Sequence, residues 1–103
     1  MKRINSPPLK GDVEISLQRY GRDPYDVFIG GDPEGLRSLA RMIHWLADVN
    51  QEASGMPDGE REHVHLSPGF QLSGNSKRTE LCRLDAKGTG DFPLNFVPKG
   101  LDM

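Results

Sequence analysis

Two histidines near the middle of the chain have the residue type and spacing to do chemistry. His63 and His65 lie two positions apart in the stretch E-H-V-H-L-S-P-G-F. Because side chains two apart share one face of a strand, the pair can offer two imidazoles to one metal ion. A small metal-binding enzyme or sensor that uses His63 and His65 is therefore one hypothesis. The alternative is that both imidazoles are solvent-facing side chains of a polar strand.

A metal site needs further ligands, and strand alternation places the nearest candidate elsewhere. Val64 and Leu66 are the apolar positions of the histidine strand, so we expect them to face the core. In the segment T-E-L-C-R-L-D, residues 79–85, we place Cys82 and Leu84 on the core face as well, so the thiol points away from the imidazoles. Cys82 is then a small buried hydrophobe and not an activated nucleophile. No catalytic residue and no cofactor are predicted.

The elements that position these residues follow from apolar spacing and turn residues. Alternation predicts a strand from Val13 and another over residues 25–29, joined by the turn Gly21-Arg22-Asp23-Pro24. Asp32 is a helix N-cap candidate and proline suits the first helical position, so the helix is expected to begin at Pro33.

The predicted helix carries more than one apolar stripe. The stripe expected to pack on a sheet is formed by Leu36, Leu39, Ala40, Ile43 and Ala47. A second stripe is formed by Met42, Trp45, Leu46 and Val49. A stripe of that kind needs a cover. The cover is either another protein or, as we expect, the C-terminal segment of the chain, with Phe92, Leu94, Phe96 and Val97.

The order strand, strand, helix, strand, strand predicts an α+β fold. Strands joined by short turns pair antiparallel, so we expect a two-layer domain in which one helix covers one face of a four-stranded antiparallel sheet. Residues 12–97 form this single domain, residues 1–11 an irregular lead-in and residues 98–103 a tail. The other sheet face is left open and polar, with His63, His65 and Arg83 on it.

Composition and charge argue against nucleic acid and membrane as partners. The 103 residues include 13 basic and 15 acidic side chains, a net charge of -2, and no basic run that could follow a phosphate backbone, so nucleic acid is not predicted as a partner. There is no apolar run long enough for a membrane span and no signal-peptide pattern. With a single cysteine, this favours a cytoplasmic protein.

Three segments together resemble a known family. They are G-D-P-E-G-L-R-S-L-A with W-L-A downstream, E-H-V-H-L-S-P-G, and E-L-C-R-L-D-A-K-G-T-G. In this order they resemble the immunity protein 32 family of bacterial polymorphic toxin systems, over roughly residues 12 to 90. The resemblance implies a protein without enzymatic activity that binds and blocks a cognate protein toxin.

Partner contacts are predicted from residue chemistry, because buried aromatic and arginine side chains dominate binding energy at interfaces. The predicted anchors are Trp45, Met42 and Tyr20, with orientation supplied by Arg83, His63 and His65. An exposed apolar stripe and a free sheet edge are also routes to a homodimer.

Overall fold

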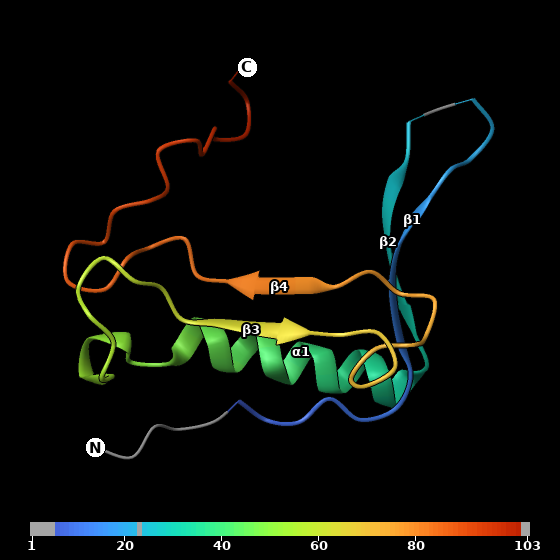
Figure 1. Ribbon diagram of the computed structural model, residues 1–103, viewed down its shortest axis with the longest axis horizontal. Helices are drawn as coiled ribbons and strands as arrows, with labels where there is room; N and C mark the ends of the chain where they lie inside the picture. The colour runs from blue at the N-terminus through green and yellow to red at the C-terminus, as the bar shows by residue number, and fades with distance from the viewer. Residues whose placement is uncertain (1–5, 23, 102–103) are drawn as a thin grey trace.

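The computed structural model describes residues 6–22 and 24–101 and confirms the predicted order of elements (Figure 1). Strands β1 (Val13–Gln18) and β2 (Asp26–Gly31) precede helix α1 (Pro33–Asp48). A short 3₁₀ helix, η1 (Gln51–Ala53), follows, and then strands β3 (His63–Leu66) and β4 (Thr79–Cys82). The fold is α+β, as predicted.

The prediction of a single four-stranded sheet is wrong. β1 pairs with β2 and β3 pairs with β4, both antiparallel, and the two pairs form separate two-stranded sheets. Figure 1 shows β3 and β4 running alongside α1, whereas the β1–β2 hairpin rises away from the end of the helix where α1 begins.

The loop between β3 and β4 explains why the sheets stay apart. Its backbone occupies the edge of β1 that a third strand would need: Ser73 N–H donates to the Val13 carbonyl at 2.8 Å and Lys77 N–H to the Ile15 carbonyl at 2.7 Å. The Ser76 hydroxyl accepts from Ile15 N–H at 3.1 Å. These bonds satisfy the backbone groups at the base of β1, so no further strand is required there.

Helix α1 begins as predicted. The Asp32 carboxylate accepts from the Gly35 N–H at 2.7 Å and from the Asp12 N–H at 3.1 Å, and Pro33 is the first helical residue. An N-cap of this kind satisfies an otherwise free donor of the first turn. The cap also ties the helix to the residue that precedes β1.

The predicted rotation of the helix is wrong. Its buried residues are Gly35, Ser38, Leu39, Met42 and Leu46, so the core face takes only Leu39 from the first predicted stripe and two members of the second. Small residues fix this rotation. A side chain on Gly35 would come 2.1 Å from the Asp12 carbonyl oxygen, and the Ser38 hydroxyl both accepts from the Lys10 N–H and donates to the Lys10 carbonyl. Backbone therefore lies where a large side chain cannot fit.

The core lies between α1, the base of β1 and the inner face of β3–β4. It is formed by Val13, Ile15, Leu39, Met42, Leu66 and Leu72, with Leu9, Val64 and Leu81 packed against it. Leu9 lies within the predicted lead-in and packs against this core. The C-terminal segment does not cover the helix: Phe92, Leu94, Phe96 and Val97 are exposed, and Figure 1 shows this segment running away from α1 on the far side of β4.

Arg83 closes the other end of the helix. Its Nη1 donates to the carbonyls of Leu46 and Val49, at 3.2 and 3.0 Å, while Nε and Nη2 form a two-pronged pair with Asp85, at 2.8 and 2.6 Å. A cation is favourable here because the final carbonyls of a helix carry partial negative charge. The last turn of α1 contains no basic residue of its own, so Arg83 supplies the charge from outside the helix.

Replacing Arg83 tests this role. We expect Arg83→Met, which keeps an apolar stem, to lower the free energy of unfolding by about 2 kcal/mol because the helix carbonyls and Asp85 lose charged donors. Urea denaturation measures the change. Arg78→Met, at an exposed arginine of the loop before β4, is the matched control. An equal effect of the two substitutions would contradict the role.

The dependence of the free energy of unfolding on acidic pH tests the contacts of Asp85 and Asp32. The hydrogen bond from Arg83 lowers the pKa of Asp85 below its ordinary value of 3.8, and backbone N–H donors, Gly35 first, lower the pKa of Asp32. A lowered folded-state pKa adds stability that is present above the unfolded value and is lost as pH falls through the folded value. We therefore expect stability to fall with acidification below about pH 4.

The variant Asp85→Asn is expected to flatten that decline, whereas Glu60→Gln, at an exposed loop carboxylate, keeps it. Denaturation at a series of acidic pH values provides the measurement. A decline of unchanged steepness in Asp85→Asn would show that its ion pair contributes nothing.

Candidate functional site

The outer face of β3–β4 brings the two histidines together with residues of the neighbouring strand. His63 lies opposite Cys82 and His65 opposite Glu80 in the antiparallel register. Directly opposed residues share a face, so all four side chains are on the side away from α1. The structure thus places the histidines on the open face, as predicted, with Val64 and Leu66 turned inward.

The predicted facing of β4 is wrong by one residue. Leu81 packs against the core, whereas Cys82 is exposed and lies on the histidine side of the sheet. Apolar spacing fits two facings of this segment, because Leu81 and Leu84 lie on opposite faces and either could point toward the core. Arg83 decides the facing, because its bonds to the helix carbonyls direct the odd-numbered residues of this segment toward α1.

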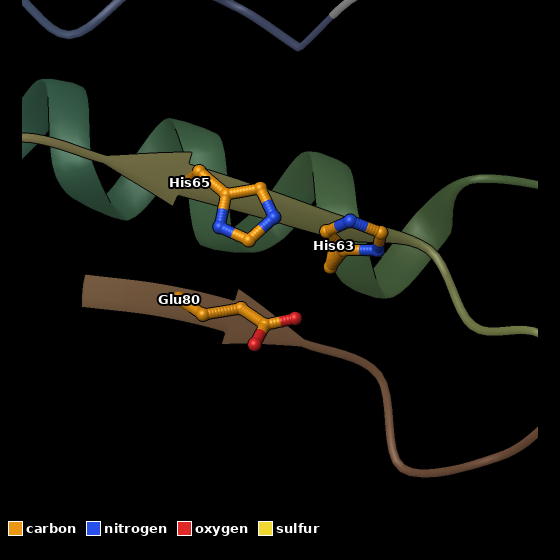
Figure 2. A group of neighbouring side chains, drawn as sticks. All are labelled: His63, His65 and Glu80. Carbon is orange, nitrogen blue, oxygen red and sulfur yellow. The ribbon is translucent and has the colours of Figure 1, made fainter. Parts of the chain in front are cut away.

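The histidine rings and one carboxylate converge on this face. Figure 2 shows His63, His65 and Glu80 projecting from the same side of the β3–β4 ribbon. One potential ligand atom from each lies within 4.8 Å of the other two. The two rings meet edge to face, with centroids 4.8 Å apart and an angle of 79°. Sequence reasoning missed Glu80 because it placed β4 in the opposite facing.

A backbone contact selects the tautomer of the neutral His63 ring. Nδ1 lies 2.9 Å from the Arg61 carbonyl oxygen. A carbonyl can only accept a hydrogen bond, so Nδ1 carries the proton and a neutral ring keeps its lone pair on Nε2. This is the arrangement that a metal-ligating histidine adopts.

A second exposed feature lies on the β1–β2 hairpin. Leu17, Val27 and Ile29 share the face that buries Val13 and Ile15 at the base, but their own side chains are exposed. Their exposed fractions are 51%, 68% and 55%. We name these three residues the hairpin surface.

Aromatic and apolar side chains surround the hairpin surface. Tyr20 and Tyr25 are exposed near its open end, with Arg19 5.9 Å above the Tyr25 ring, and Leu36 lies beside Gly31 at its base. The β1 half of the opposite face is polar: Glu14 accepts from the Ser16 hydroxyl at 2.7 Å, and Gln18 donates to both. The β2 half carries Phe28, which lies opposite Ser16 and is half-buried. The alternation of Val13, Ile15 and Leu17 is typical of a strand with one buried face, so it does not show that the outer part of this face is exposed.

The residues predicted as partner contacts are scattered. Tyr20 is exposed beside the hairpin surface, Trp45 is half-buried on α1, and His63 and His65 are together on the outer face. Met42 is only 3% exposed because it belongs to the core. Arg83 is engaged with the helix end and Asp85. The second apolar stripe that suggested Met42 as an anchor is therefore not an exposed surface.

Comparison with known proteins supplies the family. The model of the family described as immunity protein 32 matches residues 26–81, more than half of the chain. The chain belongs to the immunity protein 32 family. The match confirms the resemblance seen in the sequence, over a shorter span, and it runs from the first residue of β2 to within β4.

Other comparisons add no relative: neither the curated proteins nor the solved structures searched contain a match. Within residues 6–22 and 24–101, no helix has the length and apolar character that crossing a membrane requires. Family membership favours an immunity protein over the metal-dependent enzyme or sensor.

The Cys82 thiol offers a test of the outer face. Partial burial raises its pKa above the ordinary value of 9.0, the negative charge of Glu80 raises it further, and Arg61 opposes the shift. Since only the thiolate reacts, alkylation by iodoacetamide should be slow at neutral pH, with a midpoint above pH 9.0. Glu80→Gln should move the midpoint down and speed alkylation at fixed pH, while Glu60→Gln should not. An unchanged midpoint in Glu80→Gln would contradict the position of Glu80 beside the thiol.

Proposed function

We propose that the protein is an antitoxin that binds a cognate bacterial toxin domain and blocks it by occlusion. The observation that carries this proposal is the match to the immunity protein 32 family over residues 26–81. An immunity protein acts by binding, so it needs a contact surface and no catalytic group. The partner is a protein, and neither nucleic acid nor membrane enters the proposal.

The hairpin surface supports this proposal as the place of contact. Three apolar side chains on one exposed strand face, Leu17, Val27 and Ile29, form a patch that water solvates poorly. Binding a toxin there would bury them without unfolding the chain. β2, which contributes two of the three, lies inside the matched segment.

The surroundings of the hairpin surface fit an interface. Tyr20 and Tyr25 bring aromatic area with a polar end, the type of side chain enriched in binding hot spots. On the opposite face, Glu14, Ser16 and Gln18 of β1 hydrogen-bond to one another, and Phe28 of β2 is half-buried, so this face exposes less apolar area than the hairpin surface. Of the anchors predicted from sequence, Tyr20 is retained, whereas Met42 would have to leave the core to reach a partner.

Neutralisation of a toxin tests the proposal. The toxin domain encoded by the reading frame next to this chain's gene is expressed from an inducible promoter, and growth is followed with and without the chain. We expect the chain to restore growth and to bind the purified toxin domain in calorimetry. Absence of both protection and binding would overturn the antitoxin function.

A charge placed on the hairpin tests the surface separately. We expect Val27→Glu to weaken toxin binding at least about 30-fold, which corresponds to the loss of a 2 kcal/mol hot spot. Leu94→Glu is the matched control, because Leu94 is a fully exposed leucine on the C-terminal segment. Both variants should keep the melting temperature of the parent. Full protection by Val27→Glu would place the contact elsewhere while leaving the antitoxin function standing.

A further inference from the structure

We propose that His63, His65 and Glu80 form a binding site for a divalent transition-metal ion of the zinc type on the outer face of β3–β4. The site is separate from the hairpin surface and does not depend on the proposed function. Two imidazole nitrogens and one carboxylate oxygen are a donor set that zinc accepts, with the remaining coordination position left to water.

The cross-strand register creates this donor set. His63 and His65 alternate with inward residues of β3, and Glu80 of β4 lies directly opposite His65. The backbone positions of all three ligands are therefore held by one antiparallel ladder, as Figure 2 shows. A site on paired strands is more precisely positioned than one on loops.

The distances lie within reach of metal coordination. Ligand atoms around a tetrahedral zinc ion with bonds of about 2.0–2.1 Å are separated by about 3.3 Å. Here, one ring nitrogen of each histidine and one carboxylate oxygen of Glu80 lie within 4.8 Å of one another. His65 and Glu80 are exposed, so rotation about their side-chain bonds can close this gap without moving a packed residue.

The hydrogen bond of His63 is an independent indication. Metal-ligating histidines usually donate their second ring N–H to a carboxylate or a backbone carbonyl, which fixes the tautomer and the ring orientation. The Arg61 carbonyl occupies that position at 2.9 Å from Nδ1. The Nε2 lone pair is thereby prepared for a metal before any metal arrives.

The neighbouring thiol is not one of the converging ligands. Cys82 lies opposite His63, but its Sγ donates to the Arg83 carbonyl at 3.0 Å. The group of ligand atoms within 4.8 Å of one another contains His63, His65 and Glu80 and not Cys82. The three-residue set therefore leaves one position of the metal open toward solvent.

The third histidine provides a matched control. His44 is 79% exposed on α1, and its Nδ1 lies 3.0 Å from the Asp48 carboxylate. It offers only one imidazole and one carboxylate on the exposed side of a helix. Removing it changes the histidine content by the same amount as removing His65 and leaves the proposed site intact.

The experiment uses the full chain without an affinity tag, and Zn²⁺ as the probe. Isothermal titration should show one equivalent of Zn²⁺ bound to the parent. His65→Ala and Glu80→Gln should each weaken binding at least about tenfold, the lower end of the loss seen when even an outer-shell partner of a metal is removed. His44→Ala should bind as the parent does.

A second readout is thermal stability. Because an ion bound to groups of both β3 and β4 favours the folded state, Zn²⁺ should raise the melting temperature of the parent and of His44→Ala but not of His65→Ala. Absence of stoichiometric binding by the parent would overturn the proposal. So would an equal loss in His44→Ala and His65→Ala, since binding would then be a general property of exposed histidines.

Discussion

The contact between Arg83 and the end of α1 is the interaction on which the outer face of the molecule depends. The guanidinium reaches the carbonyls of Leu46 and Val49, so Arg83 has to lie on the helix side of the chain. Strand alternation then turns Leu81 inward and leaves Glu80 and Cys82 outward. One charged side chain thus determines which groups of β4 stand beside the histidines of β3.

Because the two sheets are separate, the β1–β2 hairpin is packed against the rest of the molecule only at its base. Because the loop over residues 73–77 bonds to the base of β1, the hairpin is held at one end only. Its apolar face is buried where Val13 and Ile15 meet the core and uncovered farther out, at Leu17 and Val27. The same alternating pattern therefore supplies core at the base of the hairpin and an exposed apolar surface toward its tip.

Much of the local structure could be predicted from the sequence, and the reasons for the failures are long-range. Turn residues and the Asp32-Pro33 pair located the hairpin and the start of α1, and the family resemblance was confirmed. The helix rotation was wrong because it is set by the approach of the Asp12 backbone to Gly35, and such a contact leaves no trace in apolar spacing. Glu80 was missed for a similar reason, since the facing of β4 follows from the partner of Arg83.

The matched segment is not by itself a complete packing unit. Residues 26–81 contain β2, α1 and β3, but they exclude β1, whose Val13 and Ile15 belong to the core, and they end before Arg83. Without β1, the strand that carries Val27 and Ile29 would lose its only pairing partner among the described strands. Even a paired two-stranded hairpin is only marginally stable in water by itself, so an unpaired strand would not keep Val27 and Ile29 on one fixed face. The surface presented by the family segment is therefore supported by residues on either side of it: β1 pairs with β2 and contributes Val13 and Ile15 to the core, and Arg83 closes the end of the helix.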